Sequence, residues 1–424
     1  MIKMKFSHIT DCHLGAWKEP EMQELNLESF NKAIDISIQE KVNFVLITGD
    51  LFDTAIPPIE IIASCAEKLK NLKENNIPCY IIAGSHDFSA SGKTIITVLE
   101  KAGLCINVSY NLSDISQSVN NKSFLDKNYF ISGLAGKKLG LEQKDLLNFK
   151  EELDERKFNI LGLHTTIKEL LPKSIINQVE KGNIDAISAE EILRNEKLKK
   201  FNYFALGHIH NQLIKNINGK IFAYPGALFP NNFSEIIENK LGNFLIITFN
   251  EGKDTQIEDI KEIPIEIKKV QFIDIDANDL NPSSLREKIF QEAKNFELED
   301  RILAIRIQGT IENGKISDIE FDEIETYFQS RKVYCLLKNI SKLESKEFQI
   351  QVKESEGKTI EEIEEHVINS ALEQKVISLD EKTMMNLLIK NLDTEKIDGE
   401  TNETFANRIT NDIIHTLNLI EIWK

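Results

Sequence analysis

The sequence has no apolar run near the roughly 20 residues that a membrane-spanning helix requires. Its first residues also lack the basic and apolar segments of a secretory signal. We therefore expect neither membrane insertion nor export. A cytoplasmic location follows, or a nuclear one if the source is eukaryotic.

Cysteine is scarce as well. The 424 residues include only five cysteines, an odd and scattered set with no Cys-x-x-Cys pair: Cys12, Cys65, Cys79, Cys105 and Cys335. Such a set suits neither a disulfide framework nor a zinc finger, and it fits a reducing compartment. We expect buried free thiols.

The chain lacks the basic excess of many proteins that bind polyanions, since its formal net charge is −17. The acidic residues are unevenly distributed, however. Residues 1–250 contain 28 Lys and Arg against 30 Asp and Glu, and the other 174 residues contain 23 against 38. Cations bound to the nearly neutral first part would attract phosphate there. Whole-chain charge thus neither establishes nor excludes a nucleic-acid partner.

Through residue 250, short apolar runs alternate with amphipathic stretches, which predicts an α/β layered domain over residues 1–260. The expected strands are 5–9, 44–48, 79–83, 129–132, 159–163, 203–206, 221–223 and 244–249. The expected helices are 25–40, 59–74, 91–101, 142–155 and 189–199.

Two further segments follow. Residues 265–345 predict a small α+β domain, with strands at 269–275, 302–308 and 333–338 and helices at 283–294 and 318–329. After a polar linker at 354–358, residues 359–424 carry apolar residues at helical spacing and predict a helical tail.

Histidine is rare too, and its placement is the strongest signal in the sequence. Five of the eight histidines lie just beyond predicted strands, in short motifs with carboxylates and glycines. These motifs are Asp11-Cys12-His13, Gly49-Asp50, Gly84-Ser85-His86-Asp87, Gly162-Leu163-His164 and Gly207-His208-Ile209-His210. Because the carboxyl ends of parallel strands meet at one edge of a sheet, we expect these side chains to gather there. His8, inside the first strand, is predicted to be a structural residue or to support a metal ligand, and His366 and His415, in the helical tail, to be surface or packing residues.

Mixed carboxylate and imidazole ligands favour Mn²⁺, Fe²⁺ or Zn²⁺ over Ca²⁺ or Mg²⁺. Asp50 directly follows a strand and could bridge two ions through its two oxygens. Two ions about 3.5–4 Å apart would bind a phosphate and lower the pKa of a water between them. The sequence therefore predicts phosphoester hydrolysis without a serine or cysteine nucleophile.

This order of motifs resembles the calcineurin-like metallophosphoesterase superfamily. Within it, the sequence is most similar to the DNA double-strand-break-repair nucleases, SbcD and the meiotic-recombination-eleven proteins. The residues that carry the resemblance are Asp11-Cys12-His13-Leu14-Gly15, Gly49-Asp50-Leu51-Phe52-Asp53, Gly207-His208-Ile209-His210 and Tyr224-Pro225-Gly226. The resemblance implies a four-layer α/β/β/α sandwich with an α+β capping domain, and a two-metal DNA exonuclease that is also an endonuclease.

The resemblance also implies a role for each matching residue. Asp11, His13 and His210 would hold the first ion, Asp50 would bridge, and His164 and His208 would hold the second. His86 would stabilise the transition state and help to protonate the leaving oxygen. Asp87 would orient His86. The expected cofactor is a pair of divalent ions, with Mn²⁺ as the first candidate.

One residue departs from the family pattern. The family has Asn before the third-strand histidine, as a ligand of the second ion, whereas this chain has Ser85. Because a serine hydroxyl is shorter and a poorer ligand, we expect weaker occupancy of the second ion, with metal-dependent activity retained.

The resemblance implies partners besides DNA. The tail at 359–424 lies where the family docks an ABC-type coiled-coil ATPase, SbcC or Rad-fifty, and the family forms homodimers. Two alternatives stay open. One is a metallophosphoesterase that acts on small phosphodiesters or phosphoproteins. The other is a DNA-repair scaffold subunit with weakened catalysis, which Ser85 would favour.

Overall fold

The computed structural model describes residues 3–88, 94–109, 124–126, 128–136, 152–172, 185–238, 242–250 and 256–346, and the single positions 146, 149, 176 and 179. The helical tail predicted at 359–424 and most of the helix predicted at 142–155 lie outside these residues. The chain divides into two compact units, Met1–Val270 and Gln271–Lys424.

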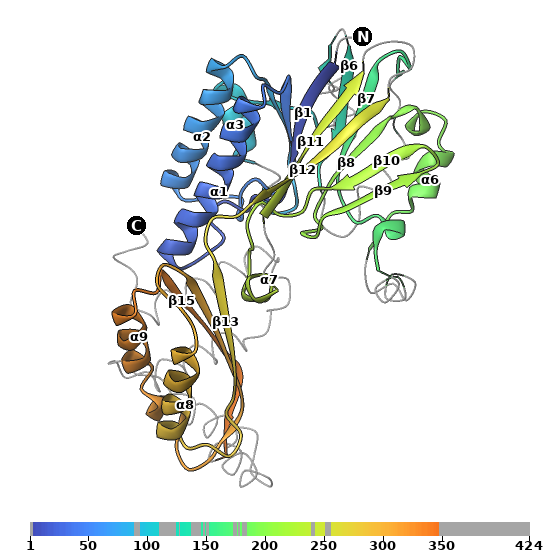
Figure 1. Ribbon diagram of the computed structural model, residues 1–424. Coiled ribbons are helices and arrows are strands. Elements are labelled where there is room, and N and C mark those ends of the chain that lie inside the picture. Colours follow the sequence, from blue (N-terminus) through green and yellow to red (C-terminus); the bar gives the residue numbers. More distant parts are fainter. Residues whose placement is uncertain are drawn as a thin grey trace, which may run out of the picture. The chain divides into compact units, whose positions relative to one another are not determined.

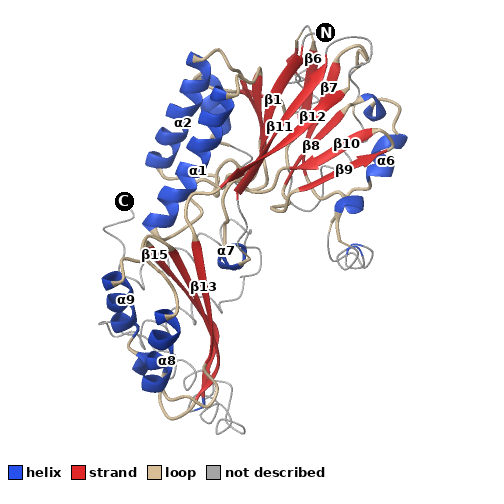
Figure 2. Ribbon diagram, in the orientation of Figure 1, coloured by secondary structure: helices blue, strands red, loops and turns tan. Residues whose placement is uncertain are grey.

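Two six-stranded sheets form the centre of the first unit (Figures 1 and 2). The first sheet has the order β12-β11-β1-β2-β3-β4, with β1 at Lys3–Ile9, β2 at Phe44–Thr48, β3 at Cys79–Ile82, β4 at Ile106–Asn107, β11 at Gly242–Asn250 and β12 at Ile257–Ile265. The second has the order β5-β6-β7-β8-β10-β9, with β5 at Phe124–Leu125, β6 at Tyr129–Leu134, β7 at Phe158–His164, β8 at Tyr203–Gly207, β9 at Leu213–Ile217 and β10 at Lys220–Tyr224.

Three apolar clusters separate four layers. One joins the first sheet to the helices α1 (Pro20–Gln39), α2 (Ile59–Glu74) and α3 (Ile96–Lys101), a second fills the space between the sheets, and a third joins the second sheet to α6 (Ala189–Arg194). Strand β2 shows how the sequence builds these layers: Phe44 and Leu46 face the inter-sheet cluster, while Val45 and Ile47 face the helices. Such a strand is buried on both faces and is apolar throughout. The α/β/β/α sandwich expected from the resemblance is confirmed.

A buried polar bridge connects the two sheets. His8 on β1 contacts the hydroxyl of Tyr203 on β8 through Nδ1 and the hydroxyl of Thr48 through Nε2, each at 2.9 Å. Thr48 donates its own proton to the Leu206 carbonyl at 3.2 Å, so its oxygen accepts from His8. Burial lowers the pKa of His8 to about 3 and keeps the ring neutral. The structural role predicted for His8 is therefore this bridge.

Four strands of this unit were not predicted from the sequence: β4, β5, β9 and β12. β4 and β5 are only two residues long. β9 and most of β12 are exposed edge strands with polar side chains, and they lack an apolar run. The helix predicted at 189–199 is interrupted at Asn195, where α6 ends.

The second unit contains the predicted strand and helix order. Strands β13 (Val270–Asp276), β14 (Ile302–Ile311) and β15 (Cys335–Ser345) form one sheet, which packs on helices α8 (Pro282–Lys294) and α9 (Phe321–Ser330). Arg306 pairs with Asp274 on the neighbouring strand and lies over the Phe272 ring, 5.1 Å from its centroid.

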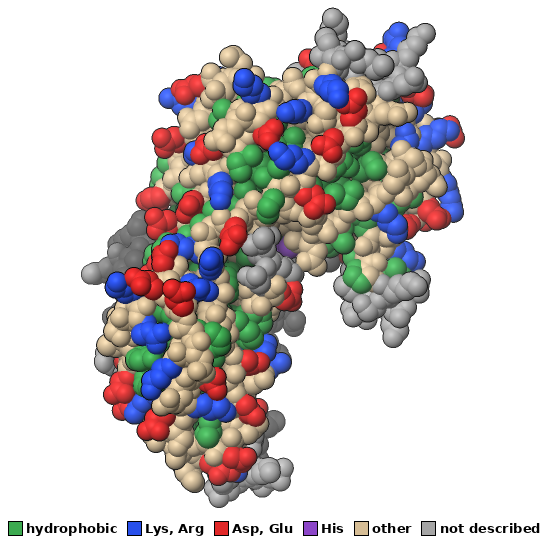
Figure 3. Space-filling model, viewed as in Figure 1, with side chains coloured by type: hydrophobic (Ala, Val, Ile, Leu, Met, Phe, Trp, Pro, Cys, Tyr) green, Lys and Arg blue, Asp and Glu red, His purple; other side chains and the backbone are tan. Residues whose placement is uncertain are grey.

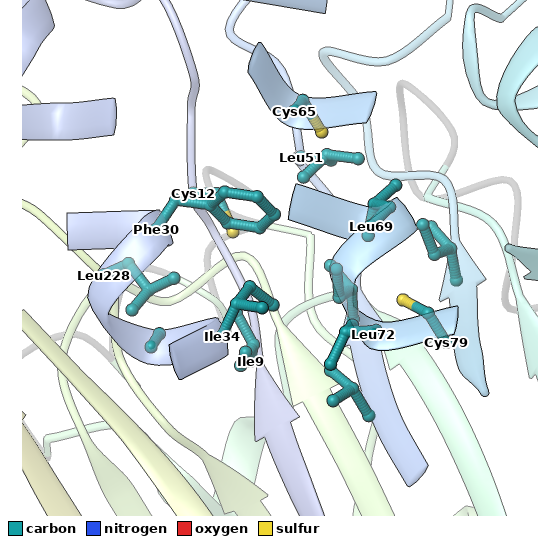
Figure 4. Packing of buried hydrophobic residues seen from close by; sticks show 14 of the residues in the cluster. Ile9, Cys12, Phe30, Ile34, Leu51, Cys65, Leu69, Leu72, Cys79 and Leu228 are labelled. Atoms are coloured by element: carbon teal, nitrogen blue, oxygen red, sulfur yellow. The ribbon is translucent and has the colours of Figure 1, made fainter. Parts of the chain in front are cut away.

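All five cysteines are buried free thiols, as expected. Cys12, Cys65 and Cys79 lie among the side chains that join α1 and α2 to the first sheet (Figure 4). Burial raises the pKa of each of these thiols, so they act as apolar packing groups.

Among the described residues, no helix is both long and apolar enough to cross a bilayer.

Candidate metal centre

The predicted motifs lie in loops at the carboxyl ends of strands from both sheets. Asp11 follows β1 and Asp50 follows β2, while His164 ends β7. The first two loops are joined by backbone hydrogen bonds, from Asp11 N to Gly49 O at 3.1 Å and from His13 N to Asp50 O at 3.0 Å. The sheet ladder therefore continues into the loops and fixes where their side chains lie.

Four of the predicted site residues have a positive backbone φ: Asp11 at 47°, His13 at 42°, Asp50 at 48° and His208 at 95°. Residues with a side chain rarely adopt this region, at a cost of about 1–3 kcal/mol each. Concentration of such residues in one place is typical of a functional site.

Carboxylate and imidazole atoms converge here. Asp50 Oδ2 lies 3.1 Å from His164 Nε2 and 3.6 Å from His13 Nε2, and Asp11 Oδ1 lies 4.0 Å from His13 Nε2. Three trios have ligand atoms within 4.8 Å of one another: Asp11, His13 and His210; Asp11, Asp50 and His164; and His13, Asp50 and His86. These trios share members, as neighbouring ion sites do.

Two buried nitrogens at the centre, His13 Nε2 and His164 Nε2, have no hydrogen-bond partner. Leaving a buried polar atom unpaired costs free energy that a folded protein rarely bears without a reason. Both nitrogens face the Asp50 carboxylate, so a cation among them would satisfy all three groups. The residues present thus fit a divalent ion.

The other ring nitrogen of each ligand histidine is already occupied. Nδ1 of His13 lies 3.0 Å from Asp53 Oδ1, that of His164 lies 2.9 Å from Thr48 O, and that of His210 lies 2.8 Å from a Glu235 oxygen. An Nδ1–H that donates to oxygen leaves the lone pair on Nε2, which is the form that binds a metal.

Glycines permit this close packing. A Cβ at Gly84 would lie 2.2 Å from Asp50 Oδ1, and a Cβ at Gly49 would lie 2.1 Å from His164 Nδ1. Neither distance is possible, so only glycine fits at these two positions.

The electrostatics of the site favour a negative charge on Asp50 and a positive charge on His164 when no metal is bound. Burial opposes charging of both Asp50 and His164, but their mutual attraction is stronger, so the pKa of Asp50 falls and that of His164 rises to about 10. Burial likewise opposes a charge on His13, yet its hydrogen bond to Asp53 and the nearby Asp50 raise its pKa. The carboxylates that stabilise protons on these two histidines also attract cations.

The structure places the remaining predicted residues as follows. The His86 side chain is 48% exposed, and its ring centroid lies 4.8 Å from that of His13. His208 donates its backbone N–H to Asp11, at 3.0 and 3.1 Å from the two oxygens, and its ring centroid lies 5.4 Å from that of His164. His208 belongs to none of the three trios found among the described residues. Ser85 is partly buried, between Gly84 and His86.

Asp87 has a different set of contacts from the one expected. Its buried carboxylate accepts hydrogen bonds from the backbone N–H groups of Leu51, Phe52 and Gly84. Burial, reinforced by Asp50, raises its pKa to about 6. The His86 ring instead contacts the backbone oxygen of Asp53, 2.8 Å from Nδ1. The geometry therefore assigns the orientation of His86 to Asp53 and the fixing of the Asp50 loop to Asp87.

Two residues of the site were not singled out from the sequence. Asp53 lies in the Gly49–Asp53 motif, but its spacing does not indicate contact with His13. Glu235 lies 25 residues after His210 in a short helix, and no local pattern connects the two. Only the folded chain brings them together.

Comparison with known proteins agrees with this site. Residues 4–212 match the calcineurin-like phosphoesterase family. The chain is 29% identical over 303 residues to the DNA double-strand break repair protein Mre11 of Methanocaldococcus jannaschii, covering 69% of this chain and 72% of that protein. It is 27% identical over 352 residues to the protein of that name from Sulfolobus acidocaldarius, covering 78% and 82% of the two chains.

The chain contains a calcineurin-like phosphoesterase domain at residues 4–212. Within the family it is similar to archaeal proteins that carry the name Mre11, which confirms the resemblance predicted from the motifs. The clustered aspartates and histidines are a divalent-metal site of this family.

Proposed function

We propose that this protein is a metal-dependent nuclease that hydrolyses phosphodiester bonds of DNA during double-strand-break repair. The observation that carries the proposal is that the Nε2 atoms of His13 and His164 make no hydrogen bond and lie 3.6 and 3.1 Å from the same Asp50 oxygen. The repair role is supported by the names of its relatives.

Two divalent ions are proposed, with Mn²⁺ as the physiological metal. Asp11, His13 and His210 would hold one ion. His164 and His208, together with Ser85, would hold the other, and Asp50 would contribute to both sites. When bound, such ions polarise a phosphate and supply a nucleophile from water at neutral pH. The protein contributes to catalysis by holding the ligand side chains in position before the substrate binds.

His86 is proposed as the group that assists the leaving oxygen. Its Nδ1 is directed at Asp53 O, so its Nε2 is the atom available to a substrate. The His86 side chain is 48% exposed, so an incoming phosphodiester can reach it. The Asp53 carboxylate also lies near this ring, 3.9 Å from Nδ1.

Acidic and basic side chains are interspersed over the visible face of the molecule (Figure 3). A polyanion would therefore meet no continuous acidic surface on the described part of this face. Attraction to the substrate phosphate would come from the bound ions.

The test compares wild type with His86→Ser in Mn²⁺ binding and in hydrolysis of duplex DNA. Because His86 is assigned to the leaving group, the variant should bind Mn²⁺ normally and lose most of its hydrolysis, about 10²–10⁴-fold for one acid–base group. A variant that cleaves DNA at the parental rate would remove His86 from the mechanism. A wild-type protein that cleaves bis(p-nitrophenyl) phosphate but not DNA would point to a small-molecule phosphodiesterase.

We further propose a homodimer. Ile56 and Ile59, just before and at the start of α2, are 84% and 79% exposed, so these two neighbouring apolar side chains are available for contact with a second copy of the chain. Ile56→Glu combined with Ile59→Glu should convert a dimer into a monomer in sedimentation analysis. An unchanged sedimentation coefficient would exclude this surface.

We also propose an ABC-type ATPase partner that docks on residues 359–424. A capping role for residues 265–345 and a cytoplasmic or nuclear location are proposed as well. These proposals rest on the family resemblance. A chain that lacks residues 359–424 should no longer capture the ATPase in a pull-down but should still hydrolyse DNA.

A further inference from the structure

A buried glutamate contacts one candidate metal ligand from outside the cluster. Glu235 lies on α7 (Phe233–Ile237) and is only 8% exposed. Its Oε1 lies 2.8 Å from His210 Nδ1. Burial of a carboxylate raises the free energy of the folded state unless hydrogen bonds compensate for it. The position of Glu235 beside a candidate metal ligand therefore calls for an explanation.

The carboxylate is held in place by its own surroundings. Its Oε2 accepts from Asn231 N at 2.9 Å, and its Oε1 accepts from Asn232 Nδ2 at 2.8 Å. Asn232 in turn caps α7 by accepting from Glu235 N at 3.0 Å. Pro230, which precedes Asn231, is fixed as well, because Trp17 Nε1 donates a hydrogen bond to Pro230 O at 2.9 Å. The oxygen that faces His210 is therefore preorganised.

We propose that Glu235 is a positioning residue for the ion held by Asp11, His13 and His210. It fixes the His210 ring with the proton on Nδ1, so that Nε2 offers its lone pair, and its negative charge makes the imidazole a stronger donor. This inference rests on the proposed function, since it needs an ion at that trio.

The two ion sites differ in this respect. His13 and His210 are each backed by a carboxylate, from Asp53 and Glu235, whereas His164 is backed by the neutral carbonyl of Thr48. Loss of the Glu235 charge should therefore weaken one ion and spare the other. A glutamate that only stabilised the loop would not discriminate between them.

Glu169 provides a matched control. Its partly buried carboxylate also supports the start of a short helix, α6, by accepting from the Ser188 hydroxyl at 2.6 Å and from Ala189 N at 2.7 Å. It belongs to none of the metal trios found in the described residues. Glu169→Gln thus removes a comparable carboxylate without touching a ligand histidine.

The experiment measures Mn²⁺ binding to the full-length chain by calorimetry and electron paramagnetic resonance, with thermal unfolding of the metal-free proteins alongside. Glu235→Gln should weaken one of two Mn²⁺ ions by about 10–100-fold, the usual effect of losing such a partner. The other ion should be unaffected. Glu169→Gln should bind both ions as wild type does, whatever its melting temperature.

Asn232→Ala is a milder second variant in case Glu235→Gln does not fold, and it should weaken the same ion to a smaller extent. Wild-type affinity at both sites in Glu235→Gln, or equal weakening of both ions, would overturn the inference while leaving the proposed nuclease intact. A wild-type protein that binds no Mn²⁺ would instead overturn the proposed function.

Discussion

The carboxylate of Asp50 lies 3.1 Å from Nε2 of His164, although the two residues belong to different sheets. Asp50 follows β2 in the first sheet, and His164 ends β7 in the second. The site therefore exists only when the two sheets are docked against each other. Metal binding should report on that docking as well as on the ligands themselves.

Mn²⁺ affinity should rise with pH. Proton binding by His164, whose pKa in the metal-free protein is about 10, competes with the ion. Below that pH the proton must leave before His164 can bind metal, so the apparent dissociation constant should fall by up to about tenfold per pH unit. Calorimetry in two buffers of different ionisation enthalpy should detect the released proton. Metal binding without proton release would contradict the ion pair.

Stability of the metal-free protein should depend on pH through the same pair. The folded pKa of His164 is raised from 6.5, so its contribution is complete below pH 6.5 and disappears as pH rises to about 10. The folded pKa of Asp50 is lowered from 3.8, so its contribution is complete above pH 3.8 and disappears at lower pH. Urea unfolding of metal-free protein should therefore show maximal contribution of this pair between pH 3.8 and 6.5. A contribution that increases from pH 7 to 10 would have the wrong sign.

Gly84→Ala should damage the metal site directly. The new Cβ would lie 2.2 Å from Asp50 Oδ1, and either the carboxylate or the loop must move. We expect at least a tenfold loss of Mn²⁺ affinity, the scale on which weaker disturbances around metal ligands act. Gly219→Ala is the control, because nothing lies within 4 Å of its new Cβ, although its φ of 80° adds a backbone strain that Gly84 does not have. It should cost about 1 kcal/mol of stability and leave Mn²⁺ affinity unchanged.

Ser85→Asn should lower the Mn²⁺ concentration needed for half-maximal hydrolysis. An asparagine carbonyl reaches further than a serine hydroxyl and is a better ligand for a divalent ion. Activity titrated with Mn²⁺ for both proteins provides the measurement. An identical metal requirement would show that position 85 does not limit occupancy.

The sequence predicted the residues of the site better than their supporting contacts. Asp11, Asp50 and His164 were recognisable because each follows an apolar run, and parallel strands bring such positions to one edge. Glu235 was not, since its contact with His210 depends on how α7 folds back. The edge strands of the sheets were also not predicted from the sequence. The residues of β9 are polar and exposed, and its pairing with β10 depends on the Asn218-Gly219 turn.

Strand β1, which leads into Asp11 and His13, pairs with β2 on one side and with β11 on the other. Its second neighbour is the segment Gly242–Asn250, encoded more than two hundred codons later. During synthesis the first ligands thus leave the ribosome long before the strand that secures them. We expect a growing chain to be harmless to nucleic acid until β11 has emerged, so that cleavage begins only when β1 has both of its neighbours.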